Sequence, residues 1–254
     1  MTELKHHYGE RFHLIDDLFS QSLLTKLCIS ETQQPEMNRI VQQLYTNLVT
    51  SAANQIFPKI KSIKKTRMNA DLESDIIDPN TKAVTVNLAR AGTFPSHICY
   101  EFLHWILKPE NIRQDHIFAA RVTDQKNTVT GTHLGSYKIG GEITDSFVLF
   151  PDPMGATGGT IESAIEYYQK EIKGPVKQFV ALHLIVTPEY LKKILNGPKN
   201  IQVFALRVDR GMSESHVLKS PLGLYWDQEK GLNDKQYIIP GAGGLGELLN
   251  NSFV

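Results

Sequence analysis

Near-continuous apolar runs alternate with segments of helical spacing through the middle of the chain. The apolar runs are rich in β-branched residues and cover residues 83–92, 116–122, 146–153, 179–188 and 200–209. The segments of helical spacing between them cover residues 95–107, 159–172 and 188–195. Unbroken apolar runs are typical of strands buried on both faces of a parallel sheet. The pattern therefore predicts an α/β fold with an open, mainly parallel sheet and helices on both faces.

The N-terminal part of the chain has a different pattern. Apolar residues lie at helical spacing at Leu14, Ile15, Leu18 and Phe19, and again at Ile40, Leu44 and Leu48. We therefore expect a helical region over residues 1–70, in which Pro35 opens one helix and Pro58 ends it. The basic run Lys59–Lys65 predicts either a solvated face or an edge strand.

No Pro/Gly-rich linker divides the chain, so we expect a single domain over residues 1–254 with a core sheet over 83–210. Residues 211–231 are polar and lack periodicity, which predicts a long loop or an insertion. Ligands of open α/β sheets bind beyond the carboxyl ends of the strands. Attention therefore turns to the residues that follow each predicted strand.

Composition excludes several classes of function. With 41% apolar and 21% charged residues the chain is globular, and its formal net charge of zero predicts no nucleic-acid or membrane partner. The two cysteines, Cys28 and Cys99, are too few for a disulfide framework or a zinc site. The N-terminus lacks the apolar segment of a signal peptide, and no run approaches 18 apolar residues. These features predict a cytoplasmic protein.

The stretch FVLFPDPMGATGGTIESAIEYY, residues 147–168, carries the most chemical information. A short apolar strand is followed by Asp152, by a glycine-rich turn and by an amphipathic helix. Backbone N–H groups of such a turn close on an anion, and the helix N-terminus adds its dipole. Thr157 and Thr160 offer hydroxyl donors to the same anion. The turn is neither a Walker A loop nor a GxGxxG turn, because it lacks GK[ST] and the GxGxxG spacing.

This stretch resembles a known family. VLFPDPMGATGGT is similar to the phosphoribosyl pyrophosphate (PRPP) motif of type I phosphoribosyltransferases, and more narrowly to that of uracil phosphoribosyltransferase. Further along, GLNDKQYIIPGAGGLGE (residues 231–247) resembles the C-terminal uracil-binding segment of that enzyme. LARAG (residues 88–92) resembles its pyrophosphate turn. The resemblance implies a type I phosphoribosyltransferase fold whose residues 231–254 form a base-binding hood.

The resemblance also implies a PRPP site. Asp152 would bind the ribose hydroxyls, and Arg90 would contact the pyrophosphate. The family has another PRPP-binding arginine where Arg121 ends its strand, although an ordinary surface ion pair is the alternative for this side chain. The 5′-phosphate would lie in a cradle formed by Ala156, Thr157, Gly158, Gly159 and Thr160.

Uracil would be read by the C-terminal segment, at Tyr237, Ile238, Ile239 and Gly243. Backbone N–H and C=O groups suffice for a base whose edge carries both donors and acceptors. The implied reaction converts uracil and PRPP into UMP and pyrophosphate for pyrimidine salvage. Mg²⁺ would enter with PRPP rather than at a metal site of the protein. The family also implies a homo-oligomer, a dimer or a higher assembly.

The C-terminal segment departs from the family pattern. Gly244 stands where the family has an aspartate, Glu247 replaces a second aspartate, and Leu248 replaces a basic residue. The carboxylate missing at 244 has candidate replacements further away, at Asp209, Asp227 and Asp234. These departures keep two alternatives open: a non-catalytic PRPP or nucleotide sensor, or partner subunit, and a transferase for a different base.

The insertion leaves two further questions. Either Asp209-Arg210 or Asp227-Gln228 corresponds to the Asp-Gln pair that precedes the uracil-binding segment in the family. The choice decides on which side of the pair about 20 extra residues lie. Tyr225 and Trp226 within this stretch would either cover the site as a lid or pack together in a surface excursion.

Overall fold

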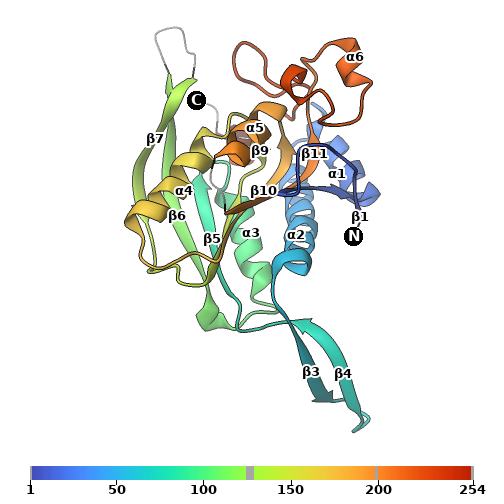
Figure 1. The fold of residues 1–254 in the computed structure, drawn as a ribbon, viewed down its shortest axis with the longest axis vertical. Helices are drawn as coiled ribbons and strands as arrows, with labels where there is room; N and C mark the ends of the chain where they lie inside the picture. The colour runs from blue at the N-terminus through green and yellow to red at the C-terminus, as the bar shows by residue number, and fades with distance from the viewer. Residues whose placement is uncertain (1, 124–128, 198–199, 253–254) are drawn as a thin grey trace.

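One nine-stranded sheet forms the centre of the computed structural model, which describes residues 2–123, 129–197 and 200–252, without the side chains of residues 119–134 (Figure 1). Its strands lie in the order β1-β2-β11-β10-β8-β5-β6-β7, and β9 pairs with β10. Neighbours from β2 to β6 are parallel, whereas β1 and β7 are antiparallel edges. The strands are β1 (Thr2–Glu3), β2 (Phe12–Asp16), β5 (Lys82–Ala89), β6 (Ile112–Thr123), β7 (Val129–Lys138), β8 (Ser146–Pro151), β9 (Met154–Gly155), β10 (Gln178–Val186) and β11 (Ile201–Val208).

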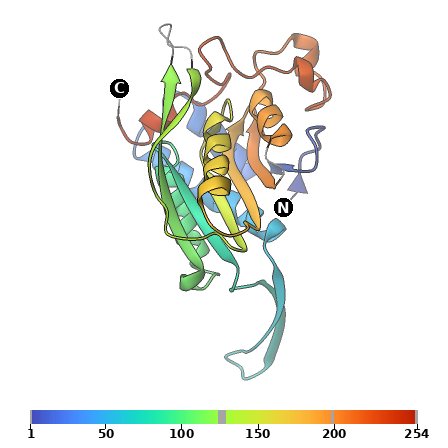
Figure 2. The same cartoon turned by 60° about the vertical axis from the view of Figure 1, so that its left-hand side comes forward.

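Helices cover both faces of this sheet, as the apolar pattern predicts (Figure 2). Alternate residues of β8 enter two separate cores: Phe147 and Leu149 pack with the helices of one face, and Val148 and Phe150 with those of the other. The helices of the first face are α1 (Leu18–Cys28), α2 (Glu36–Ile56) and α3 (Thr93–Leu103). Those of the second face are α4 (Gly159–Glu171) and α5 (Pro188–Asn196). The predicted α/β class is confirmed.

Short helical turns complete the described part of the chain. They are the 3-10 helices η1 (Pro109–Asn111) and η2 (Trp226–Gln228) and the α-helices α6 (Ser215–Leu218) and α7 (Leu245–Leu248). Within the described ranges, no helix has the length and apolarity needed to cross a membrane.

The prediction of a helical region over residues 1–70 is wrong in two places. Residues 12–16 form β2, which pairs with β11. The first helix begins at Leu18, and its N-cap Asp17 accepts the N–H groups of Phe19 and Ser20. Leu18 and Phe19 are exposed rather than buried. The sheet therefore begins in the N-terminal region and is not confined to residues 83–210. The first helix and the long helix after Pro35 match the prediction.

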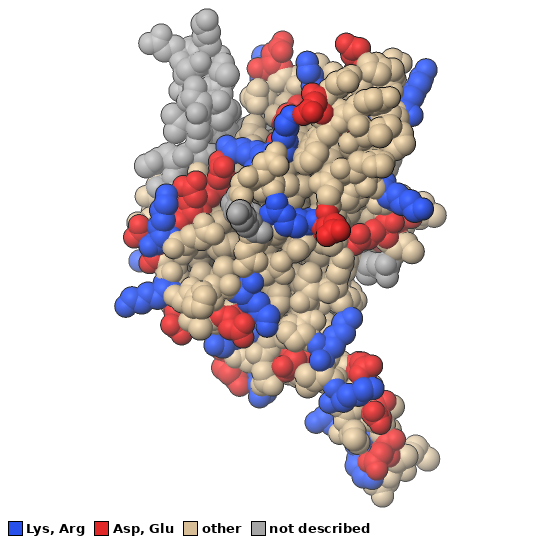
Figure 3. All heavy atoms as spheres, viewed as in Figure 1, with Lys and Arg blue, Asp and Glu red and all other residues tan. Residues whose placement is uncertain are grey.

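The second departure is a hairpin of β3 (Lys59–Lys65) and β4 (Asp71–Ile77), which extends away from the sheet (Figure 1). This outcome matches the edge-strand alternative for the basic run. Lysines of β3 face carboxylates of β4 in register, with ion pairs from Lys61 to Glu73 and Asp75 and from Lys65 to Asp71. Both charges are interspersed along the hairpin on the face that Figure 3 shows.

Candidate active site

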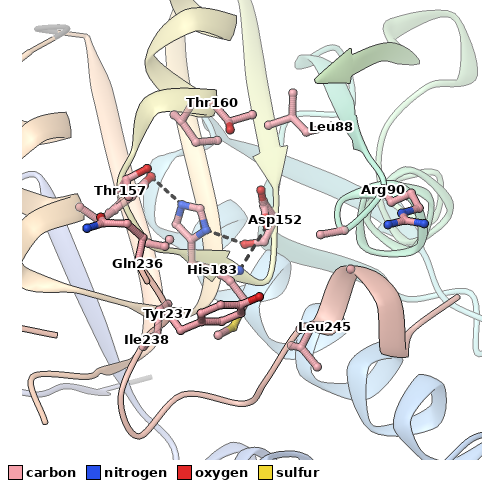
Figure 4. A pocket seen from close by; sticks show the side chains of 18 of the residues that line it. Leu88, Arg90, Asp152, Thr157, Thr160, His183, Gln236, Tyr237, Ile238 and Leu245 are labelled. Atoms are coloured by element: carbon pink, nitrogen blue, oxygen red, sulfur yellow. Dashed lines mark hydrogen bonds between the residues drawn. The ribbon is translucent and has the colours of Figure 1, made fainter. Parts of the chain in front are cut away.

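A cavity of about 410 Å³ lies at the carboxyl ends of the central strands. Its walls include residues 88–91 at the end of β5, Asp152 and the turn 154–158 after β8, and residues 236–238 and 243–247 of the C-terminal segment. Figure 4 shows Arg90 at one end of this cavity, Thr157 and Gln236 at the other, and Asp152 between them. Three stretches far apart in sequence thus meet where the strand-end rule places a ligand.

Asp152 follows β8, whose six residues are all buried, and it enters the cavity directly from the core. Its backbone is held on both sides, because its N–H donates to the carbonyl of Leu182 and its own carbonyl accepts a bond from the His183 ring. Its carboxylate accepts the N–H of Met154 at 3.2 Å. An acid fixed in this way presents lone pairs to hydroxyl groups of a ligand.

The glycine-rich turn has the geometry of an anion cradle. Gly158 adopts φ +80° at the start of α4, a conformation that L-residues rarely accept. The turn is tied to the start of α5 by Thr187, the N-cap of this helix, whose hydroxyl donates to the carbonyl of Ala156 at 2.6 Å. Ala156, Thr157, Gly158 and Thr160 line the cavity, whereas Gly159 is the first residue of α4 and is not among the lining residues.

Arg90 lies in the turn between β5 and α3 and lines the cavity with a half-exposed side chain. The turn is close to the end of β8, since a Cβ on Gly92 would lie 3.0 Å from the carbonyl oxygen of Pro151. The guanidinium donates to Ser252 Oγ at 2.6 Å and lies 3.5 Å from a carboxylate oxygen of Glu247. A planar fork placed here suits phosphate oxygens.

The C-terminal segment covers the cavity from the other side. Tyr237, Ile238 and Gly243 line it, as the resemblance implies. Ile239 does not line it, because its N–H donates to Gly231 and its carbonyl accepts from Gly211, which turns both groups into the protein.

Two carboxylates outside the cavity hold this segment in place. Glu189, at the start of α5, accepts the N–H groups of Gly231 and Leu232 at 2.9 to 3.2 Å. Asp209, only 2% exposed, accepts the N–H of Gly241 at 2.7 Å and forms an ion pair with Arg207. The position of the C-terminal segment is therefore set by the start of α5 and the end of β11.

His183 is a residue of the site that the sequence analysis missed. It is fully buried beneath the cavity, and burial lowers its pKa to about 4. The carbonyl of Asp152 can only accept, so Nδ1 carries the proton and donates to it at 2.5 Å. Nε2 then accepts the hydroxyl of Tyr190 at 2.5 Å. The neutral ring buttresses Asp152 from below; a lone histidine within an apolar run gave no signal of this role.

Other expectations have mixed outcomes. The side chain of Arg121 lies outside the described residues, so its role stays a prediction. Asp209 directly follows β11. Asp227 lies in the insertion, where it is exposed and pairs with Lys192 of α5. Asp209-Arg210 therefore holds the strand-end position, and the extra residues follow it.

The insertion does not form a wall of the cavity, since none of residues 211–231 is among its described lining residues. Trp226 packs edge-on against Tyr8 at 5.3 Å and donates its indole N–H to the carbonyl of Pro188. The surface-excursion alternative describes this arrangement better than a lid. The excursion packs on the body of the protein rather than on itself alone.

The parallel sheet, the glycine-rich turn after β8 and the covering C-terminal segment define the type I phosphoribosyltransferase class. A solved structure of a protein from Aquifex aeolicus has a TM-score of 0.71 at 21% identity and covers 94% of this chain and 97% of that one, which shows the same fold.

The sequence comparisons give the family. The profile of uracil phosphoribosyltransferase matches residues 14–227, and the chain belongs to this family. A uracil phosphoribosyltransferase of Aquifex aeolicus is 27% identical over 226 residues, 87% of this chain and 88% of the relative. One from Mycoplasma genitalium is 26% identical over 238 residues, covering 89% and 92%.

Proposed function

We propose that the protein transfers the phosphoribosyl group of PRPP to uracil, giving UMP and pyrophosphate. The observation that carries the proposal is the convergence of three elements on one cavity: the glycine-rich cradle, Asp152 and the Arg90 turn, under a base-binding segment. The bond between C1′ and the pyrophosphate oxygen breaks, a C1′–N bond to uracil forms, and the uracil nitrogen loses its proton.

Each wall of the cavity has a separate task in this reaction. The turn 156–160 at the start of α4 binds the 5′-phosphate through backbone N–H groups and the helix N-terminus. Asp152 accepts the ribose hydroxyls, and Arg90 neutralises charge that grows on the departing pyrophosphate. Tyr237 and Ile238 hold uracil against C1′, which supplies the proximity that such a transfer requires.

The residues present also fit Mg²⁺ that arrives with PRPP. Such an ion takes one or two carboxylates besides substrate phosphates and keeps several waters. The described lining residues offer Asp152 and Glu247 as carboxylates. The ion would neutralise the pyrophosphate as a leaving group.

The test is UMP formation from labelled uracil and PRPP, comparing the wild-type protein with Asp152→Asn. The isosteric amide keeps the fold but carries no charge, so we expect kcat/KM for PRPP to fall about 10²-fold or more, in line with the loss of a charged contact to the reacting sugar. Unchanged kinetics would contradict the assignment of the ribose site.

Product with another base but not with uracil would instead favour a transferase of different specificity. PRPP or UMP binding without any product would favour the sensor, which the missing carboxylate at Gly244 makes the second candidate.

We also propose a homo-oligomer that acts in cytoplasmic pyrimidine salvage. The hairpin of β3 and β4 supports assembly, because Ile63, Met68 and Leu72 are all more than half exposed on it. The free thiols of Cys28 and Cys99 support a reducing compartment. Sedimentation of the full chain measures the assembly, and a monomer at enzyme concentrations would refute it.

A further inference from the structure

Glu247 introduces a second negative charge into a cavity meant for an anionic substrate. The charged side chains among the described lining residues are Arg90, Asp152 and Glu247, a net charge of −1. PRPP brings one phosphate and one pyrophosphate, so like charges would meet in this cavity. A carboxylate at the pyrophosphate end of such a site stabilises binding only if a cation lies between it and the substrate.

Two distances describe the position of the Glu247 carboxylate. One oxygen lies 3.5 Å from the guanidinium of Arg90, which is the predicted pyrophosphate ligand. The other lies 2.5 Å from where a Cβ on Gly244 would be. The carboxylate thus fills the space that a side chain at position 244 would occupy. It reaches this space from the third residue of α7, whose N-cap is Gly244.

We propose that Glu247 binds the Mg²⁺ carried by the pyrophosphate of PRPP and supplies from α7 the carboxylate that Gly244 lacks. This inference rests on the proposed function. The three candidates named from the sequence do not line the cavity: Asp209 is engaged by Arg207 and Gly241, Asp227 pairs with Lys192, and Asp234 is exposed.

The readout is the dependence of PRPP affinity on Mg²⁺, measured by calorimetry as the ratio of Kd in EDTA to Kd in Mg²⁺. Glu247→Ala should lower this ratio about tenfold or more, the effect of losing one charge-assisted contact. In EDTA the variant should bind PRPP no more weakly than wild type, because a like charge is removed and Arg90 is released from its carboxylate partner. Glu247→Gln keeps the side-chain volume but removes the charge, so it should lower the ratio as Glu247→Ala does.

A relocation variant makes the test specific. Gly244 has φ −81° and ψ 74°, which an aspartate tolerates. In Gly244→Asp with Glu247→Ala, the new carboxylate enters the space vacated by the old one and should restore most of the ratio. Gly244→Ala with Glu247→Ala should not. Glu73→Ala, on the distant hairpin, should leave the ratio unchanged.

The outcomes separate this inference from the proposed function. Wild-type protein that binds PRPP while Glu247→Ala keeps the wild-type ratio would overturn the inference alone. Equal changes of Kd in EDTA and in Mg²⁺ would also overturn it, because Glu247 would then act only on Arg90. Wild-type protein that does not bind PRPP would overturn the proposed function itself.

Discussion

The anchor of the C-terminal segment gives a prediction whose size follows from the structure. Asp209→Asn keeps the shape of the side chain but leaves Arg207 without its buried counter-charge. Breaking a buried pair costs about 3–5 kcal/mol, and we take the lower end because the Arg207 side chain is a quarter exposed. For a chain of this length each kcal/mol lowers Tm by about 2–4 °C, so the expected loss is about 6–12 °C.

The effect on catalysis should be confined to the binding of uracil. Asp209 also accepts the N–H of Gly241 in the segment that covers the cavity, so weakening this bond loosens the wall formed by Tyr237 and Ile238. We expect the KM for uracil to rise several-fold while the KM for PRPP changes little. The assays are thermal unfolding followed by circular dichroism and initial rates with each substrate varied in turn.

Asp227→Asn provides the matched control, because Asp227 has the same chemistry but its side chain is 88% exposed and pairs with Lys192 at the surface. Exposed pairs contribute little to stability, so neither Tm nor KM should change measurably. Equal Tm values for the two variants, or a defect in Asp209→Asn that falls on PRPP instead of uracil, would refute the reasoning.

Two further predictions concern the cradle and its support. Gly158→Ala places a Cβ at φ +80°, so it should lower the free energy of unfolding by about 1–2 kcal/mol and weaken PRPP binding measured by calorimetry. Gly9→Ala is the control: Gly9 has φ +99° in open space and does not line the cavity, so this change should cost stability without affecting binding. Burial lowers the pKa of His183 from 6.5 to about 4, so between these two pH values the unfolded chain binds a proton at this ring that the folded chain does not bind. Stability should therefore decrease as the pH falls from about 6.5 to about 4. His183→Gln removes this contribution; its urea midpoint should fall less between pH 7 and pH 5 than that of wild type, and an equal fall would contradict the assignment.

The strands that were predicted correctly are those buried on both faces. Each of them has an unbroken apolar run, and such a run indicates a buried strand without reference to any distant residue. Residues 12–16 gave no such signal. This strand is only five residues long, and it is held in the sheet by pairing with residues 203–205, which are about 190 residues later in the sequence. Local spacing joined Leu14 and Ile15 to the following helix, whereas tertiary pairing made them a strand.

The candidate site divides in the same way. Asp152 and the turn after it are local in sequence, so a single stretch predicted both the fold of the backbone and its chemistry. The role of His183 depends on Asp152 and Tyr190, which lie on different elements. The placement of the Glu247 carboxylate over Gly244 depends on the path of α7. Neither can be read from spacing, because each arises from contacts between elements.

The insertion explains how extra chain enters this fold without disturbing the site. Its two ends meet: Met212 donates its N–H to the carbonyl of Lys230, and a Cβ on Gly231 would lie 2.2 Å from the carbonyl oxygen of Asp209. The segment between them is thus a closed excursion from one point of the backbone.

Buried Glu229 attaches the segment to the N-terminal region by accepting the hydroxyl of Tyr8, and it also accepts bonds from Arg210 and from the N–H of Gly223 within the segment. The two ends of the insertion lie side by side, and the residues between them pack against the N-terminal region. A short connection could therefore join Asp209 to the C-terminal segment along the same path. Additional length therefore costs mainly loop-closure entropy, which grows only slowly with the number of residues.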